Sequence, residues 1–304
     1  MKKVVITGGT GAVGVALIKN LTAKGIEVLV IAKKKSKRID RIPQNELVKI
    51  VFSDLDGYES LLFNYGEKYD IFYHLAWEGT FGDARNDLYL QNRNVQYTLD
   101  AVSLAKKLNC GLFIGAGSQA EYGSFNGLLS FDTPVNPESG YGVAKLCAGQ
   151  MSRIKCRQLG IKHIWTRILS VYGPYDGENT LISLCLRDFP KGISPEFTPA
   201  EQIWDYLYSS DCANALYLIA LNGKNGQIYT IGSGQKRVLK DYIEEIKNII
   251  NPELKLKIGS IPYSENQIMH LCADISELTK DTGWVPQVSF KEGIEKTIKW
   301  IKEK

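Results

Sequence analysis

The residues of this sequence best suited to chemistry are a tyrosine and a lysine four positions apart, Tyr141 and Lys145. On a helix these positions share one face. A nearby ammonium group favours phenolate and lowers the tyrosine's pKa from its usual value of ~10. Tyr141 could then exchange a proton with a carbinol or carbonyl oxygen near neutral pH. Ser118 follows an apolar run, and its hydroxyl could hydrogen-bond the same oxygen.

A glycine-rich segment near the N-terminus offers a site for a phosphate. Gly8, Gly11 and Gly14 recur every three residues between a short β-rich run and an amphipathic stretch. Glycine permits close approach of a pyrophosphate, and the N-terminus of the following helix, at Ala12 and Val13, presents free N–H groups and a positive dipole end. A glycine turn without a ligand is the alternative. At the first strand–helix junction, however, this spacing favours dinucleotide binding.

The end of the second expected strand bears on which dinucleotide binds. NAD sites usually carry an acidic residue there, ~20 residues after the glycines, which binds the ribose 2′-hydroxyl. This chain has Lys33 and Lys34 instead, and these could bind a 2′-phosphate. NADP(H) is therefore favoured, and NAD(H) stays possible. A solvated basic loop is the alternative, while the lack of interleaved aromatic residues argues against a nucleic-acid partner.

The elements around these motifs alternate between strand and helix, which is typical of a parallel sheet covered on both faces. The pattern predicts an α/β fold: a Rossmann-type doubly wound parallel sheet, with a smaller mixed α/β domain after it. We expect a dinucleotide-binding domain over 1–167 and a mainly substrate-binding domain over 168–304, of which some segments could return to the first. The expected strands are 4–7, 28–31, 47–52, 71–75 and 112–116, and the expected helices are 94–108, 142–157, 239–250 and 290–302.

Composition narrows the class of protein. Hydrophobic residues make up 44% and charged residues 23%, as in a globular domain, and the mild net charge of +4 does not by itself indicate a nucleic-acid partner. No apolar run approaches the ~20 residues of a membrane span, and no secretory leader is evident, so a cytoplasmic location is expected. Six cysteines without a C-x-x-C pair, and three histidines, argue against disulfides or a metal site. We expect the thiols to be buried.

Taken together, these motifs resemble the extended short-chain dehydrogenase/reductase family, the NAD(P)-dependent epimerase/dehydratase group. The resemblance implies that Ser118, Tyr141 and Lys145 carry out catalysis and that Lys145 also holds the nicotinamide ribose. It further implies that His74 is structural. The same resemblance assigns cofactor contacts to Asp54 and Leu55, at the adenine, and to Leu75 and Ala76. It runs over residues 7–14, 54–55, 74–76, 118–123, 141–145, 171–174 and 283–286, with Asp70, Asn94, Arg167, Asp205 and Asp211.

The resemblance also narrows the reaction. The family's 4,6-dehydratases have Asp-Glu where this chain has Gln119 and Ala120, and without that acid and base water elimination loses its proton carriers. Bifunctional epimerase-reductases have a cysteine at Ala120. The lysine loop, and the likeness of residues 173–179 to enzymes that make CDP-linked deoxyhexoses, favour NADPH-dependent 4-ketoreduction of a 4-keto-6-deoxyhexose nucleotide sugar. An NAD-dependent nucleotide-sugar 4-epimerase is the main alternative, and a non-catalytic NADP-sensing protein is a third.

Three positions depart from the family in the region that grips the nucleotide diphosphate. Trp204 stands where an arginine is common, Ser170 where an asparagine is expected, and a second arginine expected near Ser264 is absent. Arg187 or Lys191 could substitute, or the substrate could lack a diphosphate. A homodimer is expected through the helices at 94–108 and 142–157. The substrate-contacting candidates are Trp77, Gln119, Ser170, Arg187 and Trp204.

Overall fold

A seven-stranded, all-parallel sheet forms the centre of the computed structural model, which describes residues 1–61, 67–265 and 267–303. The strand order is β10-β6-β5-β4-β1-β2-β3, so the chain winds outward from β1 to β3 and then restarts on the other side at β4. The ends of β1 and β4 therefore flank the switch point, where such sheets bind ligands. The strands are β1 Lys3–Thr7, β2 Glu27–Ala32, β3 Val48–Phe52, β4 Ile71–His74, β5 Leu112–Ser118, β6 Lys162–Ile168 and β10 Ile228–Ile231.

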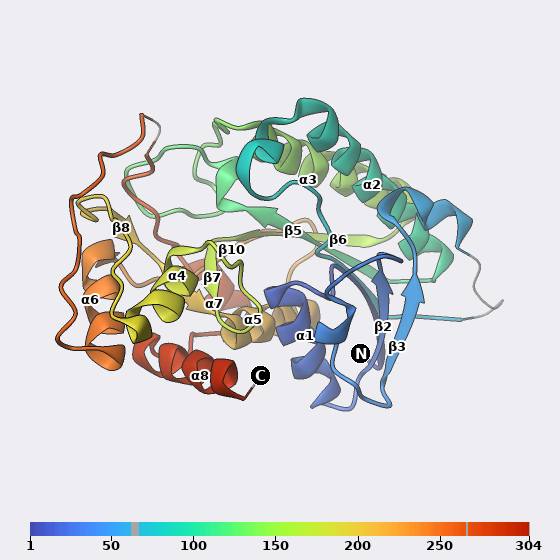
Figure 1. Ribbon diagram of the computed structural model, residues 1–304. Helices are drawn as coiled ribbons and strands as arrows, with labels where there is room; N and C mark the ends of the chain where they lie inside the picture. The colour runs from blue at the N-terminus through green and yellow to red at the C-terminus, as the bar shows by residue number, and fades with distance from the viewer. Residues whose placement is uncertain (62–66, 266, 304) are drawn as a thin grey trace.

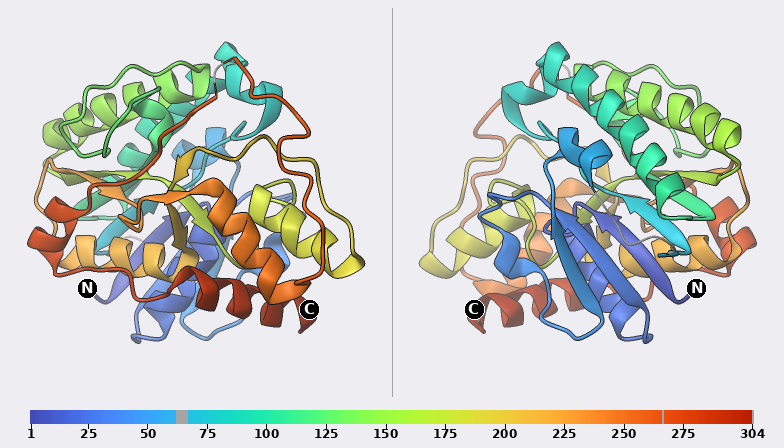
Figure 2. Two further views of the ribbon diagram at one scale, coloured as in Figure 1. Left: turned by 90° about the vertical axis from the view of Figure 1, so that its left-hand side faces the viewer. Right: turned by 90° about the vertical axis from the view of Figure 1, so that its right-hand side faces the viewer.

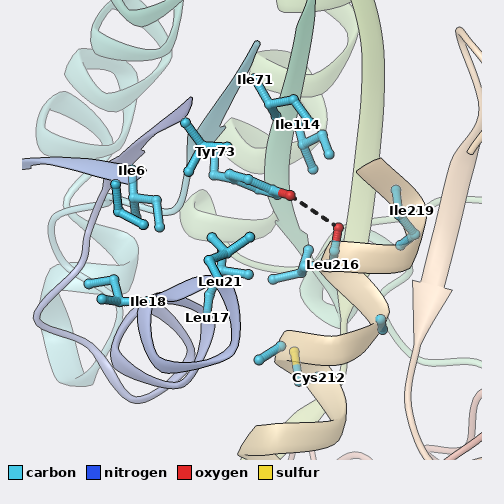
Figure 3. Packing of buried hydrophobic residues seen from close by; sticks show 14 of the residues in the cluster. Ile6, Leu17, Ile18, Leu21, Ile71, Tyr73, Ile114, Cys212, Leu216 and Ile219 are labelled. Carbon is cyan, nitrogen blue, oxygen red and sulfur yellow. Dashed lines mark hydrogen bonds between the residues drawn. The ribbon is translucent and has the colours of Figure 1, made fainter. Parts of the chain in front are cut away.

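Helices cover both faces of this sheet, as expected of a doubly wound fold (Figure 1). Helices α1 (Ala12–Thr22) and α5 (Ser209–Asn222) pack on one face, and α2 (Leu88–Lys107) and α3 (Gly140–Leu159) on the other. In the first layer, shown in Figure 3, the Tyr73 hydroxyl donates to the Leu216 carbonyl of α5 at 3.5 Å. The Rossmann-type prediction is thus confirmed.

A smaller unit lies beside the sheet, on the side where the strands have their carboxyl ends (Figure 2). Its core joins Tyr172, Tyr242, Phe290 and Ile294. From the segment 168–304, which was expected to be mainly substrate-binding, the elements α5 and β10 belong instead to the large sheet and its cover. After residue 167 the chain also forms the helices α4 Leu181–Asp188, α6 Leu239–Ile250, α7 Ser276–Thr282 and α8 Phe290–Lys302, the strands β7 Ser170–Tyr172, β8 Ile203–Trp204, β9 Tyr206–Tyr208 and β11 Arg237–Val238, and the 3-10 segment η5 Phe189–Lys191. Further 3-10 segments lie in the first half of the chain: η1 Ile39–Arg41, η2 Leu55–Ser60, η3 Gly82–Asn86 and η4 Gln119–Glu121.

Most expected elements appear, but two helices begin earlier than the apolar pattern predicts. Helix α2 starts at residue 88 rather than 94, because Asp87 accepts a hydrogen bond from the Leu90 N–H and caps it. Leu88 and Tyr89, in its first turn, are exposed, so they break the apolar periodicity. In α3, Ser139 caps the N-terminus and Gly160, at φ 70°, ends the helix.

The six cysteines are free thiols, and five of them are buried small residues as expected. Cys147 on α3 is exposed, contrary to the expectation, because it lies on the side of the helix away from the sheet. No helix within the described residues is long and apolar enough to cross a membrane. Within the same residues, no group of three or more His, Cys, Asp or Glu side chains could hold a metal ion.

Candidate active site

The three candidate catalytic residues meet at the carboxyl end of the central sheet. Ser118 ends β5, while Tyr141 and Lys145 lie one turn apart in the first half of α3, and all three are buried. Lys145 Nζ donates to the Ala116 carbonyl at 2.6 Å and lies 5.8 Å from the Tyr141 ring centroid. The fold thus assembles a hydroxyl, a phenol and an amine in one place.

The acidity of these groups differs from the expectation for an exposed tyrosine–lysine pair. Burial raises the pKa of Tyr141, and the Ser118 hydroxyl and the Arg85 charge only partly oppose this. Burial also lowers the pKa of Lys145 to about 7. The prediction of a lowered pKa for Tyr141 is therefore wrong, because the loss of solvent around the phenol outweighs the groups that favour its ionised form.

Two further side chains enclose the Tyr141 ring. The Trp77 ring meets it edge-on at 6.0 Å between centroids, and Lys145 Nζ lies 3.8 Å above the Trp77 ring. On Tyr141, the Arg85 guanidinium lies 4.4 Å from the ring centroid. Trp77 was a candidate for substrate contact, and the structure places it among the catalytic candidates, with its Nε1 donating to Gln91 at 2.9 Å.

A buried glutamate behind Ser118 ties the site to the next strand. Glu121 Oε1 accepts from the Ser118 N–H at 2.9 Å and from Trp165 Nε1 at 3.0 Å, and Oε2 accepts from Arg167 Nε at 3.0 Å. The Glu121 and Arg167 side chains are only 1% and 3% exposed. Sequence reasoning missed Glu121, although Ser118-x-x-Glu121 is the capping-box pattern that predicts it.

The glycine segment has the close packing that a dinucleotide loop requires. A Cβ on Gly8, at φ 76°, would lie 2.6 Å from the backbone of Leu75 and Ala76, and one on Gly14 would lie 2.3 Å from the Gly8 carbonyl. A Cβ on Gly11 would meet only that carbonyl, at 3.6 Å, so this glycine keeps open the space before α1. Helix α1 has no capping side chain and no acid in its first turn, which suits a phosphate.

The lysine loop after β2 is exposed, but one of its lysines has a partner. Lys33 Nζ lies 2.9 Å from Glu78 Oε1, with side chains 59% and 38% exposed, and the charges of Asp54 and Asp56 also act on it. Lys34 is exposed, and no partner for it is found among the described residues. An acid is therefore present beside the lysine loop, contributed by the segment after β4 rather than by β2.

The other residues expected at the cofactor lie around the same sheet edge. Asp54 and Leu55 follow β3 at the start of η2, and the Leu75 N–H donates to the Thr7 carbonyl at 3.2 Å, which holds Leu75 and Ala76 against the end of β1. His74 is buried between hydroxyls, with Nδ1 2.9 Å from Thr7 Oγ1, and burial lowers its pKa to about 3. A neutral, hydrogen-bonded imidazole fits the structural role.

The candidate substrate residues do not form one group. Gln119 Oε1 accepts from Ser118 Oγ at 3.4 Å and so lies beside the candidate catalytic residues. Trp204 Nε1 donates to Ser170 Oγ at 2.9 Å, so two of the three positions that depart from the family bind each other. Arg187 makes two hydrogen bonds to Asp188, at 2.9 and 2.8 Å, on α4, so its guanidinium already has a partner.

The chain matches a known protein family and resembles several known proteins. The model of the family described as "NAD dependent epimerase/dehydratase family" matches residues 4–232. A Methanocaldococcus jannaschii protein named "Putative UDP-glucose 4-epimerase" is 28% identical, over 98% of both chains, and CDP-abequose synthase of Salmonella typhimurium is 28% identical, over 97% of both.

Solved structures share the fold. UDP-N-acetylglucosamine 4-epimerase from Methanobrevibacter ruminantium, in complex with UDP-N-acetylmuramic acid, superposes with a TM-score of 0.88 at 24% identity, covering 99% of this chain and 98% of that one. At this identity the likeness concerns the fold alone, whereas the family match covers most of the chain and includes the glycine segment, Ser118, Tyr141 and Lys145. The chain belongs to the NAD-dependent epimerase/dehydratase family of enzymes.

Proposed function

We propose that this enzyme is an NADPH-dependent 4-ketoreductase of a 4-keto-6-deoxyhexose nucleotide sugar. The observation that carries the proposal is the assembly of Ser118, Tyr141 and Lys145 beside Gln119 and Ala120. This set can move one proton at a carbinol or keto oxygen. It has no acid or base at positions 119 and 120, which elimination of water would need.

The proposed roles of the chain's own residues follow from their positions. Tyr141 donates its phenolic proton to the keto oxygen, and the Ser118 hydroxyl hydrogen-bonds that oxygen. Lys145, one turn further along α3, stabilises the phenolate that remains and holds the ribose of the cofactor. When bound, the nicotinamide supplies the hydride that reduces the keto carbon to a carbinol. Hydride and proton together account for the two hydrogens that the substrate gains.

The glycine segment and the lysine loop support the cofactor assignment. The backbone N–H groups of Ala12, Val13 and Gly14 would hold the pyrophosphate, since the first turn of a helix leaves these donors free. Lys34, and Lys33 when it leaves Glu78, would meet the 2′-phosphate of NADP(H). Asp54 and Leu55 would contact the adenine.

On the substrate side, Trp77 and Gln119 would bind the sugar, and the smaller unit around Trp204 would bind the nucleotide. Trp204 and Ser170 satisfy each other's hydrogen-bonding groups. We infer that the Trp204 ring contacts the base or ribose, rather than replacing the arginine's grip on a diphosphate. Arg187 would contribute only after its contact with Asp188 breaks.

One observation favours the second candidate, an NAD-dependent nucleotide-sugar 4-epimerase. The Lys33–Glu78 ion pair places a carboxylate beside the proposed ribose site, and an acid near the 2′-hydroxyl is the usual mark of NAD. A 4-epimerase uses the same proton carrier, Tyr141, in both directions and retains its cofactor. Purified enzyme that carries NAD after gel filtration would support this candidate, whereas enzyme free of NAD would support the reductase.

We further propose that the elements beyond residue 167 that lie outside the sheet bind the substrate, and that the enzyme acts in the cytoplasm. We also propose a homodimer in which α2 and α3 of two copies pack together. Val143, Met151 and Ile154 are exposed apolar side chains on α3, and a partner would cover them. Light scattering at micromolar concentration should give twice the mass of one chain. A monomer would contradict the dimer.

The direct test of the reductase is NADPH oxidation against a panel of 4-keto-6-deoxyhexoses linked to CDP, dTDP, UDP and GDP. At least one should be reduced by the wild type and not by Tyr141→Phe. Formation of a 4-epimer from a saturated nucleotide sugar, without net NADPH oxidation, would favour the epimerase. NADPH binding without turnover of any substrate would instead indicate a sensing protein.

A further inference from the structure

Arg85 lies against the face of the Tyr141 ring, although no motif singles it out. Its guanidinium carbon is 4.4 Å from the ring centroid, whereas Lys145 Nζ is 5.8 Å from it. Lys145 is also committed to the Ala116 carbonyl and to the face of Trp77. Arg85 is therefore the closer of the two cations to the Tyr141 ring. Its charge is also permanent, because arginine stays protonated at every accessible pH.

The loop that carries Arg85 is held firmly. Gln91, which is buried in α2, donates through Nε2 to the carbonyls of Gly79 at 2.9 Å and Ala84 at 2.8 Å. Arg85 Nη1 itself donates to the Thr80 carbonyl at 3.1 Å. The amide of Gln91 therefore clamps both ends of the loop, and the guanidinium is anchored within it.

Three polar or charged groups act on the Tyr141 phenol from the elements packed around it: Arg85 from η3, Ser118 from β5 and Glu121 from η4. Lys145, on the same helix as Tyr141, lies 5.8 Å from the ring centroid. Ser118 and Arg85 favour the ionised phenol, and Glu121 disfavours it. Because the negative charge of a phenolate spreads into the ring, a cation on the ring face attracts phenolate more strongly than phenol.

We propose that Arg85 is a positioning residue that stabilises ionised Tyr141 and fixes the plane of its ring. The role of Arg85 in turnover rests on the proposed function. The effect of Arg85 on the Tyr141 phenol is independent of that function, because the arrangement exists without any substrate. In ketone reduction, the proton leaves Tyr141 as the hydride arrives, and Arg85 stabilises the phenolate that is left.

The test follows the titration of Tyr141 itself by NMR of protein labelled with carbon-13 at tyrosine Cζ. The Tyr141 signal is assigned by its loss in Tyr141→Phe. In Arg85→Gln the titration midpoint should rise by about one pH unit or more, as expected when an opposite charge within ~4–6 Å is removed. Arg85→Met, which keeps an aliphatic contact with the ring, should show the same rise, and Arg85→Lys a smaller one.

Arg157→Gln is the matched control, because Arg157 is exposed in the last turn of α3, and its midpoint should equal that of the wild type. A midpoint in Arg85→Gln and Arg85→Met within the error of this control would overturn the inference. In the reductase assay, the fall in kcat at high pH should move upward by the same amount in both neutral variants. If the wild type reduces no substrate of the panel, the proposed function fails, while the NMR titration still decides the role of Arg85.

Discussion

Two ion pairs flank the proposed site, and they differ in burial. Glu121–Arg167 lies behind Ser118 with side chains 1% and 3% exposed, while Lys33–Glu78 lies at the cofactor loop with 59% and 38% exposed. A buried pair cannot lose one partner without leaving an uncompensated charge, whereas an exposed pair contributes little and is screened by salt. The contrast indicates that the reacting end is rigidly built and that the cofactor end is readily adjusted.

The largest expected effect comes from breaking the buried pair. Glu121→Ala should lower the free energy of unfolding by about 3–5 kcal/mol, because Arg167 is left buried without a counter-charge and the Ser118 N–H and Trp165 Nε1 lose their acceptor. Urea unfolding measures this. Adding Arg167→Met to Glu121→Ala should recover part of the loss. A single variant within about 1 kcal/mol of the wild type would mean that the pair does not hold the site together.

Removing the proposed proton donor should affect chemistry while leaving the fold intact. Tyr141→Phe should lower turnover by at least ~10²-fold, within the range for a positioned acid or base. The cofactor's Kd, measured by fluorescence titration, should be nearly unchanged, because the hydroxyl is not needed for the glycine segment. Turnover near that of the wild type would remove Tyr141 from the mechanism.

Changes to the exposed Lys33–Glu78 pair should have the smallest effects. Two variants should change the affinity for NADPH in opposite directions. Lys33→Ala combined with Lys34→Ala should weaken NADPH by about tenfold, or ~1.4 kcal/mol, whereas Glu78→Gln should strengthen it a few-fold because Lys33 is released. NADH carries no 2′-phosphate, so its Kd should barely change in either variant. Added salt should reduce the preference for NADPH. An equal loss for both cofactors in the lysine variant would make the loop merely structural.

Much of this architecture is predictable from local patterns. Continuous apolar strands that alternate with helices predict the parallel sheet, and the glycine spacing predicts the tight turn at Gly8. The helix spacing of Tyr141 and Lys145 predicts that they share a face. The capping-box pattern would also have predicted Glu121. These signals are local because each one depends on a few neighbouring residues.

What the sequence could not predict depends on residues far apart in the chain. Glu78 reaches Lys33 across 45 positions because β4 and β2 flank β1, and Arg85 reaches Tyr141 because α2 clamps its loop. Burial, which sets the direction of both pKa shifts at Tyr141 and Lys145, arises only when the layers pack. Asp205 matched a family motif, and its fully buried carboxylate accepts backbone N–H groups of Ser233, Gly234 and Ala273, a structural tie.

The measurement that tests the central claim most directly uses NADPH that carries deuterium in place of the transferred hydrogen at C4 of its nicotinamide ring. It follows the transfer of this deuterium to the sugar. The enzyme, supplied with the 4-keto-6-deoxyhexose nucleotide that it accepts from the panel, should produce a sugar with one deuterium at C4 for each NADPH oxidised, as seen by mass spectrometry and NMR. Tyr141→Phe should abolish this transfer. Absence of deuterium transfer and of NADPH oxidation, together with conversion of a saturated nucleotide sugar into its 4-epimer by enzyme that retains bound NAD, would contradict the reductase and identify an epimerase.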